Sequence, residues 1–566
     1  MKASRIFVVT LFVMLGPVTG VLPARAEINT NFVKDFLKRY QPAKVALPAT
    51  AGPQSAQDVA QLIRSGQLPL TVGELINLVL QNNLDVGLNR LSPLSSMYFI
   101  DTMYRPYEPT LRLQASVNRN TVPATSQLIG AQQLSTLGGA YSLGFSQSLD
   151  TGTNIGVDFS MNRSSSNSVF NTFNPSYTGL LRYSFSQHLL NGYGRAINNH
   201  LIRIARNNQK ISETQFERQL IDLVAQAQRS YWDLVFAADD IKVKQRSMDL
   251  AQKTLSDNQI QVQIGTLAPI DVVQAESEVA NRRVQFVTST FTEVQTQDQV
   301  KKLITSQGDP GLILAKLMPA QGVPKPETSD VMPVEQAIKV ALENRPEMKQ
   351  LQLDLESKKI DLDYTKNQLL PTVDFLASYT QNGVGGKETI RNGFGPTAPI
   401  IAQVNGGLGD AFGQLFGYGY TGYAVGFSVQ IPLRNRAAQG DNARAMTDER
   451  IAEQRISSQA QQIALEVRNA LTQVDMNRAR IEAATKAREL AERRLEAEQK
   501  KFDLGASTIR FVLEEQRNVA QAQTDELQAI VNYTKSLVDI DRAMGMTLKK
   551  NNIEIEKALA SGTTAR

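Results

Sequence analysis

The chain has 566 residues, more than one ordinary hydrophobic core holds, so repeats or several layers are expected. Hydrophobic residues make up 42% of it and the mean hydropathy is −0.25, which excludes a bundle of membrane-spanning helices. The absence of cysteine excludes disulfides and thiolate metal sites. The net charge of +5 comes largely from the first 26 residues. Residues 27–566 carry 57 basic and 55 acidic side chains, so no nucleic acid partner is indicated.

Residues 1–26 have the pattern of a secretory signal peptide. Lys2 and Arg5 form the basic start, the apolar run IFVVTLFVML follows, and Ala24-Arg25-Ala26 is a small-x-small cleavage site. The apolar run is too short to span a bilayer as a helix. An uncleaved N-terminal anchor is the alternative interpretation. The Pro- and Ala-rich residues 27–69 predict a flexible extension.

Two long blocks of the chain match each other at fixed offsets, which predicts a tandem repeat. LTVGELINLVLQNN (70–83) matches MPVEQAIKVALENR (332–345), and at the same offset Pro109-Thr110 falls on Pro371-Thr372. Further along, IGTLAPIDVVQAE (264–276) matches LGASTIRFVLEEQ (504–516). We therefore predict repeat 1 over 70–306, a linker over 307–331, repeat 2 over 332–548 and a loose tail over 549–566. Each repeat would consist of a helix, strands, a long helix, a glycine turn and a second helix.

The long helices carry heptads, which are typical of a coiled-coil seam. The first helix repeats Leu220, Ala227, Leu234, Ile241, Met248 and Leu255, with Val224, Tyr231 and Ala238 four positions after the first three. The second repeats Ala460, Val467, Val474 and Ile481, with Ile456, Ile463 and Ala470 at the intermediate positions. Each helix would run about 65 residues, or about 100 Å. A structural rod or a dimeric coiled coil would show the same pattern.

Six segments between the helices alternate apolar with polar or small residues, as transmembrane β-strands do. They are 111–117, 141–149, 155–161, 181–185, 373–379 and 423–431. A soluble β-sandwich also alternates, but six such segments behind a signal peptide favour an outer membrane. The Ser-, Asn- and Gly-rich stretches 164–176, 382–399 and 405–422 predict extracellular loops.

With its two-repeat plan, the sequence LLPTVDF (369–375) before a strand and the paired glycine turns, the chain resembles the TolC-like outer-membrane efflux proteins from about residue 70 to 548. The resemblance implies a mixed α+β membrane protein. It would be a homotrimer, with four strands per chain in a shared transmembrane β-barrel and a coiled-coil α-barrel in the periplasm. The hairpin around 149–155 is surplus to four strands, so it either enlarges the barrel or folds beside it.

By the same resemblance, the chain is the exit duct of an efflux or type I secretion system in the outer-membrane lipid. An inner-membrane transporter would deliver substrate, and a periplasmic adaptor (membrane fusion) protein would dock at the helix tips. The docking residues would be Gly265, Thr266, Leu267, Gly505, Ala506 and Ser507. The two glycines also have a purely structural interpretation, because a tight turn needs them.

The family closes its tunnel mouth with acidic rings and polar tethers near these tips. Aligned on the glycine, Glu514 matches an inner-ring acid, while Phe511 departs from the second ring position. The usual tether positions hold Phe502 and Ser507, which also depart. Asp271 matches an acid of the first repeat, and Arg510 is a candidate replacement partner. We predict a gate built from a Phe511 ring above a Glu514 ring that favours cations. Alternatively, Glu514 is an ordinary acid near a helix N-terminus.

No nucleophile–base pair, metal-ligand spacing or nucleotide loop stands out, so we expect neither an enzyme nor a cofactor. The two histidines, His188 and His200, have no adjacent ligand cluster, and we expect no metal site. The remaining alternative is a periplasmic coiled-coil structural protein with β modules.

Overall fold

The computed structural model describes residues 38, 40–42, 63, 66–125, 132–304, 310–323, 332–393 and 398–555. The predicted signal peptide and most of the predicted extension 27–69 lie outside these residues. The chain divides into two compact units, Met1–Leu47 and Pro48–Arg566, and the following concerns the second unit.

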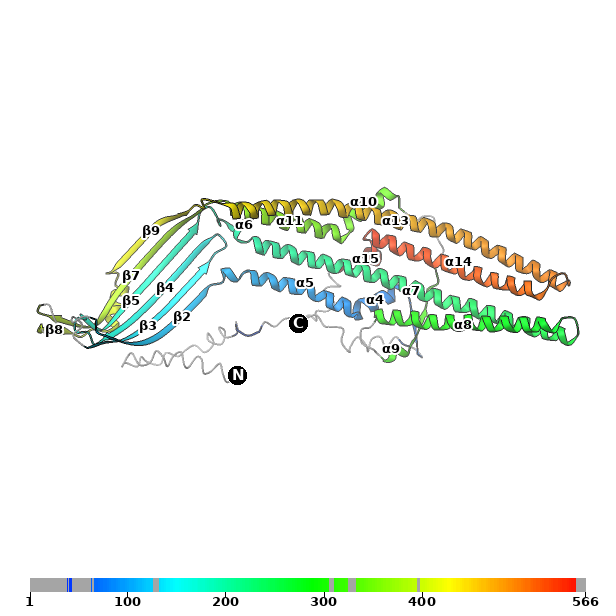
Figure 1. The fold of residues 1–566 in the computed structure, drawn as a ribbon, viewed down its shortest axis with the longest axis horizontal. Helices are drawn as coiled ribbons and strands as arrows, with labels where there is room; N and C mark the ends of the chain where they lie inside the picture. The colour runs from blue at the N-terminus through cyan, green and yellow to red at the C-terminus, as the bar shows by residue number, and fades with distance from the viewer. Residues whose placement is uncertain are drawn as a thin grey trace. The chain divides into compact units, whose positions relative to one another are not determined.

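The second unit mixes helices and sheet, and the order helix, strands, long helix, shorter helix occurs twice along it (Figure 1). The first part contains β1 (Gln67–Leu70), α4 (Val72–Asn82), α5 (Leu84–Met103), η2 (Arg105–Tyr107), β2 (Thr110–Pro123), β3 (Gln133–Ser148), β4 (Thr153–Ser166), β5 (Phe173–His188), α6 (Arg195–Asn198), α7 (His200–Gln263) and α8 (Pro269–Ile304). The second contains α9 (Pro310–Leu314), β6 (Lys316–Pro319), α10 (Val334–Asn344), α11 (Pro346–Asn367), β7 (Thr372–Arg391), β8 (Ile400–Val404), α12 (Leu408–Phe416), β9 (Thr421–Gln430), α13 (Arg436–Asp503), α14 (Ile509–Ala543) and α15 (Thr547–Lys550).

Seven strands form one antiparallel sheet in the order β2-β3-β4-β5-β7-β8, with β9 also paired to β7. Each long strand coincides with one of the six predicted alternating segments, so the sheet holds more strands than the four per chain that the resemblance implies for the barrel. The hairpin β3–β4, which was surplus to that count, lies within the sheet between β2 and β5. Six of the seven strands are at least 10 residues long, while β8 has five residues.

The predicted loops are shorter than expected because the strands run further. β4 continues to Ser166 and β5 begins at Phe173, inside the predicted loop 164–176. β7 continues to Arg391, well into the predicted loop 382–399. The predicted loop 405–422 contains helix α12, whose N-terminus is closed by a 2.6 Å hydrogen bond from the Gly407 amide to Asp410.

The lengths of the two long helices agree with prediction, at 64 residues for α7 and 68 for α13. α7 packs between α8 and α14, and α14 packs between α7 and α13 (Figure 1). Along this layer α8 and α13 are therefore the outer helices. In the half of the long helices nearer the sheet, α5 packs on α7, and α11 packs on both α7 and α13 (Figure 1).

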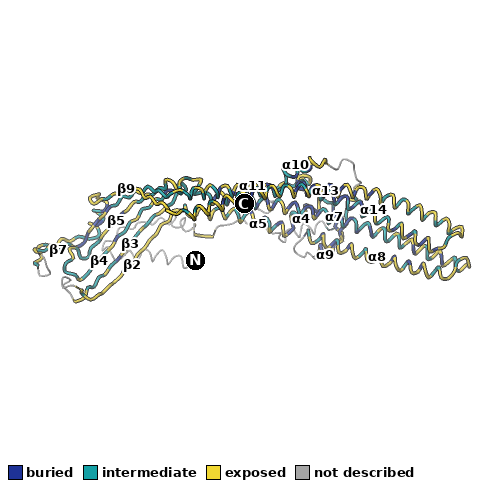
Figure 2. Tube along the Cα trace, turned by 45° about the horizontal axis from the view of Figure 1, so that its top comes forward, coloured by how far each residue is buried: buried dark blue, intermediate teal, exposed yellow. Residues whose placement is uncertain are grey.

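The heptad positions of α7 are buried in its first half, with Leu220, Ala227 and Tyr231 each at most 1% exposed. Further along, Ile241, Met248 and Leu255 are only half-buried. Toward the glycine turns the helices are mostly intermediate or exposed (Figure 2). In α13 the buried seam residues are Ile463, Val467, Val474 and Ile481. The hydroxyl of Tyr231 donates to the Leu70 carbonyl (3.1 Å), so a seam residue also fixes β1.

Three ordered pieces lie in segments that were predicted to be an extension, a linker or a loose tail. β1 pairs in parallel with β6, and Leu68 and Leu317 are at most 1% exposed in the core beneath them. Ile553 and Ile555 of the predicted tail pack against a buried cluster that includes Phe216. Four-residue strands carry too little alternation to be recognised in the sequence. The two strands are also 249 residues apart in the chain, from Gln67 to its partner Lys316.

Candidate functional site

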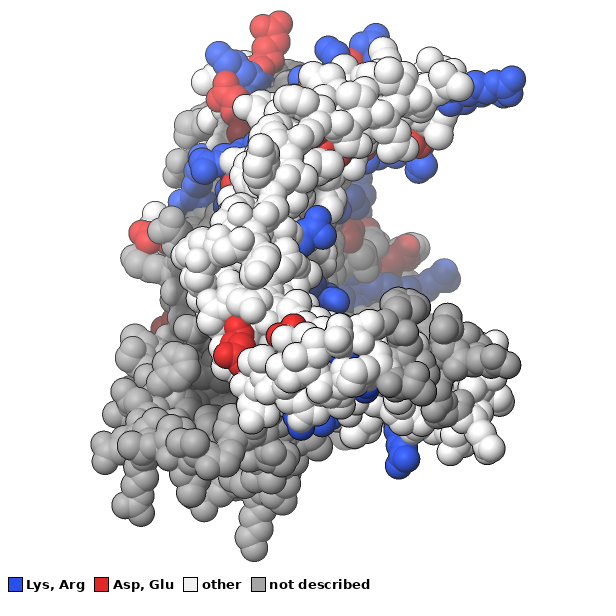
Figure 3. Space-filling view, turned by 90° about the vertical axis from the view of Figure 1, so that its left-hand side faces the viewer, with Lys and Arg blue, Asp and Glu red and all other residues white. Residues whose placement is uncertain are grey.

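The long sheet has one apolar face that extends unbroken over six strands. One row across the register consists of Leu111, Phe145, Val157, Tyr183, Tyr379 and Tyr423, with one residue from each long strand. Most of this face is uncovered, since Leu113, Val425 and Phe427 are each at least 59% exposed. Viewed toward the strand end, most of the visible described surface is neither acidic nor basic (Figure 3). An exposed apolar surface of this extent marks contact with a membrane or another protein.

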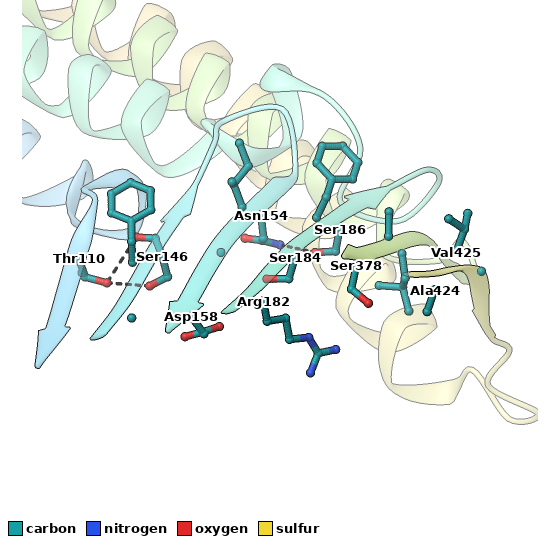
Figure 4. Close-up of a pocket in the computed structure, with 18 of the residues that line it drawn as sticks. Thr110, Ser146, Asn154, Asp158, Arg182, Ser184, Ser186, Ser378, Ala424 and Val425 are labelled. Carbon is teal, nitrogen blue, oxygen red and sulfur yellow. Dashed lines mark hydrogen bonds between the residues drawn. The ribbon is translucent and has the colours of Figure 1, made fainter. Parts of the chain in front are cut away.

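The opposite face of the same strands is polar or small. A parallel row there consists of Thr110, Ser146, Gly156, Ser184, Ser378 and Ala424. This face lines a hollow of about 660 Å³ (Figure 4). Thr110 and Ser146 share a 2.7 Å hydrogen bond across β2 and β3. The hydroxyl and amide side chains give this surface the character of a wetted wall.

Charged side chains are concentrated in one row of the polar face. Arg112, Asp158 and Arg182 lie at the same level of β2, β4 and β5, and Asp158 is the register partner of Arg182. Figure 4 shows Asp158 and Arg182 projecting from the same side of their strands. A further charged residue, Asp374, lies near the helix end of β7, 2.6 Å from the Nδ1 atom of His188.

Helix α12 packs against the apolar face of the sheet. Ala411 and Leu415 are fully buried there, and the ring of Phe412 stacks on Phe159 at 6.0 Å. The close approach needs glycines in the strand below. A Cβ atom added to Gly383 would clash with the Ala411 carbonyl oxygen at 2.1 Å. One added to Gly385 would clash with the Gly407 carbonyl oxygen, at the N-terminus of α12, at 2.2 Å. The predicted extracellular loop is therefore in part a helix docked on the sheet.

Both glycine turns at the helix tips have the same local structure. Gly265 and Gly505 have φ angles of +80° and +75°, which only glycine adopts without strain. At each tip the amide of the next residue donates to a carbonyl five residues earlier, from Thr266 to Gln261 (2.9 Å) and from Ala506 to Lys501 (2.8 Å). This is the Schellman motif, and it satisfies carbonyls that the helix end leaves free.

The predicted docking residues lie at these two turns, and most are exposed. Leu267 and Ser507 are half-buried, and the other four are exposed. The hydroxyl of Ser507 donates to Glu498 of α13, so this side chain closes its own turn. The sequence placed these residues at turns correctly, but nothing in the fold assigns them a partner.

The predicted gate residues fall on two helices and are not all brought together. Phe511 is 50% exposed and Glu514 is exposed, three residues apart on α14, so they share one face of it. Asp271 lies in the first turn of α8. Among the described residues, no hydrogen bond or ion pair joins Arg510 to Asp271 or to Glu514. The suggested tether position Phe502 instead packs against a small apolar cluster of Ile509, Val512 and Leu513.

A buried ionic cluster that sequence reasoning missed joins the two hairpins a few turns from their tips. Glu278 of α8 is 6% exposed and accepts from Arg282 Nε (2.7 Å) and from Arg517 of α14 (3.1 Å). Burial lowers the pKa of the Arg282 guanidinium, and the adjacent Glu278 opposes that shift. Next to Arg517, Gln516 donates to Thr254 of α7 (3.2 Å). The four-residue spacing of Glu278 and Arg282 was visible in the sequence, but the Arg517 contact depends on the tertiary fold.

Polar contacts continue along the whole α7–α14 interface. Lys244 donates to Thr524 at 3.0 Å, and Thr524 donates to Asp240 at 3.1 Å. Farther from the tips come three ion pairs, Asp233–Lys535, Arg229–Asp539 and Asp222–Arg542, at 2.7, 2.6 and 3.1 Å. The two hairpins are thus held together by these polar bonds as well as by a buried apolar cluster that includes Leu234 of α7 and Val531 of α14.

No helix in the described part of the chain is both long and apolar enough to cross a membrane.

The sequence matches a known family over most of its length. The family described as outer membrane efflux protein matches residues 75–305 and 337–546. The pyoverdine export outer membrane protein OpmQ of Pseudomonas aeruginosa is 22% identical over 348 residues, which cover 60% of this chain and 64% of that protein. The chain therefore spans less than two thirds of the curated relative that it matches.

Solved structures show the same fold at low sequence identity. The Campylobacter jejuni CmeC outer membrane channel has a TM-score of 0.60 at 13% identity, covering 97% of this chain and 98% of that one. The outer membrane protein VceC of Vibrio cholerae has a TM-score of 0.58 at 14% identity, covering 88% and 99%. At these identities the likeness establishes the fold.

Proposed function

The chain belongs to the outer membrane efflux protein family, and we propose that three copies of it form the exit duct of a tripartite efflux or type I secretion system. As a member of that family it is an outer-membrane efflux protein with a periplasmic extension. The trimer, the barrels and the working partners are the proposed part.

The observation that carries the proposal is the two-faced sheet. Its apolar row from Leu111 to Tyr423 faces one way, and its polar row from Thr110 to Ala424 faces the other. In a bilayer every backbone group needs a bond, so such a sheet must close into a barrel with its polar face inward. A periplasmic structural protein with β modules would bury the apolar face instead of exposing it.

The outer helices of the helical layer support assembly with further copies. α8 exposes an apolar stripe at helical spacing, consisting of Val284, Val287, Phe291 and Val294, each 43% exposed or more. α13 also has exposed apolar residues, more widely spaced along the helix, at Ile451, Leu465, Met476 and Leu490. If α8 of one copy packs on α13 of the next, the layer closes into a coiled-coil α-barrel. Within each chain, the repeated order of elements would correspond to two tandem structural repeats.

The glycine turns would form the periplasmic mouth of this tunnel. The exposed turn residues Gly265, Thr266, Gly505 and Ala506 are accessible to a periplasmic adaptor, which would in turn couple the duct to an inner-membrane transporter. The name of the relative OpmQ makes pyoverdine one compound to test as cargo.

The gate would lie on α14, just inside the mouth. The shared face of Phe511 and Glu514 would point to the axis, and three copies of Glu514 there would repel anions and hold cations. The Glu278–Arg517 and Thr254–Gln516 contacts would keep α14 in the closed position. For the gate to open, these side chains would exchange their bonds to each other for bonds to water.

The first experiment is to purify the protein from outer membranes in detergent and to measure its mass and its conductance in planar bilayers. We expect a trimer that resists carbonate extraction and gives small, mostly closed pores. A soluble elongated dimer without pore activity would overturn the proposal in favour of the coiled-coil structural protein.

Glu514→Gln tests the gate in the same bilayers. We expect block by divalent cations added on the periplasmic side to weaken, because the ring loses its charge. Glu515→Gln is the matched control, since Glu515 is the adjacent half-buried acid and accepts from Asn518 (3.3 Å) on the same helix. Equal cation block in the parent and in Glu514→Gln would remove the acidic ring from the proposal.

A further inference from the structure

The hairpin β3–β4 is inserted into the middle of the sheet, not appended to its edge. β2 pairs with β3 along its full length, from Thr110 opposite Ser146 to Pro123 opposite Gln133. β4 in turn pairs with β5 from Thr153 to Ser164. Among the described strands, β2 has no neighbour other than β3. If the hairpin left the sheet, β2 would lose its entire ladder.

The inserted strands obey the two-faced pattern of the strands on either side. Leu143 and Phe159 continue the apolar row from Leu113 to Leu181, while Gly144 and Asp158 continue the polar row from Arg112 to Arg182. A hairpin folded beside a barrel would have no reason to keep both faces in register with the wall. The pattern is that of membrane-facing and lumen-facing positions in one continuous wall.

The two free edges of the sheet are suited to meet each other in neighbouring copies. β2 and β9 each have a single neighbour among the described strands, and all fourteen residues of β2 are exposed. Successive long strands are antiparallel, so with six of them β9 runs opposite to β2. β9 of one copy can therefore add to β2 of the next without breaking the antiparallel order, and an even count permits closure.

We propose that every copy contributes six long strands to the barrel, so that the trimer has eighteen, and that the β3–β4 hairpin widens the lumen. This rests on the trimeric duct proposed above. Barrel diameter grows roughly linearly with strand number, so eighteen strands give a lumen about one and a half times as wide as twelve. The hairpin also supplies an acid, Asp158, to a lumen belt that otherwise carries Arg112 and Arg182. The outer end of the duct is thereby fitted to bulky polar cargo.

Pairs of cysteines introduced into this cysteine-free chain decide between six and four strands. In the six-strand wall, Leu113 is opposite Leu143 and is three strand spacings, or about 14 Å, from Leu181. Disulfides need Cα atoms within about 7 Å. We expect Leu113→Cys with Leu143→Cys to oxidise within the chain, and Leu113→Cys with Leu181→Cys to stay reduced. A bridge in the second pair, or none in the first, would overturn the six-strand wall.

Labelling of the lumen provides an independent readout. Asp158→Cys should react with a negatively charged methanethiosulfonate added to the outer side of a bilayer, and the single-pore conductance should change. Val157→Cys is the matched control, because Val157 is adjacent on β4 but belongs to the apolar row. Unchanged conductance at Asp158→Cys in a pore-forming trimer would overturn the insertion of the hairpin. A protein that forms no trimer and no pore would instead overturn the proposed function.

Discussion

The two returning helices, α8 and α14, have almost the same length and very different surroundings. They span 36 and 35 residues, and each follows a glycine turn of the same geometry. α14 is covered on both sides by α7 and α13, and it buries an apolar set that includes Val531, Tyr533 and Ile540. α8 buries mostly polar residues, among them Glu278 and Glu293, and leaves its apolar stripe exposed.

This difference shows that related hairpins can serve as the interior and the edge of one layer. α14 is packed on both sides by helices of its own chain, so its sequence has the apolar positions of a core helix. α8 has an apolar stripe that no described element of the chain covers, and that stripe is the feature that favours a second copy. Substitutions on the two helices should therefore damage different things: folding in α14 and assembly in α8.

The largest effect is expected at the centre of α14. Val531 is fully buried, so Val531→Asp places a carboxylate in the core without a partner, and the protein should not fold. Val531→Ala keeps the site apolar and should cost about 2 kcal/mol while leaving the trimer intact. Yield of protease-resistant protein measures both. Recovery of folded Val531→Asp would show that α14 is not an interior helix.

The next largest effect is expected in α8, where a charged substitution should prevent assembly of the trimer. Phe291 is 65% exposed in one chain, and Phe291→Asp should leave the chain folded but monomeric in detergent, because the charge would be buried between copies. Gln285→Asp, at an exposed position outside the stripe, is the control and should remain trimeric. Mass measured by light scattering separates the two. A trimeric Phe291→Asp protein would place the interface elsewhere.

A smaller effect is expected where α8 and α14 meet. Arg517→Ala removes one of the two arginines from buried Glu278, and a partly exposed pair of this kind contributes about 1 kcal/mol. If the pair holds the gate closed, the open fraction in bilayers should rise about fivefold. Arg283→Ala, which removes an exposed arginine of α8 outside the cluster, should leave the open fraction unchanged. Equal open fractions in Arg517→Ala and the parent would make the cluster purely structural.

Local periodicity predicted those parts of the fold that depend on one segment alone. The heptads of α7 and α13 located both helices, and the heptad residues Leu220 and Val467 are buried. The later seam residues Met248 and Leu255 are half-buried because the helices near the tips pack as a single layer, which a heptad does not report. Both glycine turns were placed correctly, because a positive φ has a strong residue preference.

Pairings between distant segments could not be predicted in this way. Alternation marked the hairpin β3–β4 as strands, but its place between β2 and β5 depends on register with segments on both sides. The docking of α12 depends on Gly383 and on side chains of β4, so a glycine-rich run looked like a loop. At the candidate gate, spacing put Phe511 and Glu514 on one face, whereas the Glu278–Arg517 pair joins residues far apart in the chain.

The most local effect should be the same in both hairpins, and it concerns the tips. Gly265→Ala and Gly505→Ala each force a Cβ into a left-handed turn, at a cost of about 1–2 kcal/mol. Open space surrounds both glycines, so strain in φ is the whole effect. Amides of the tip peptides should exchange with deuterium about 5–30 times faster in each variant. Gly440→Ala, within α13 and also in open space, should not accelerate exchange. Faster exchange at only one tip would mean that the helices, and not the shared turn, set the stability of the tunnel mouth.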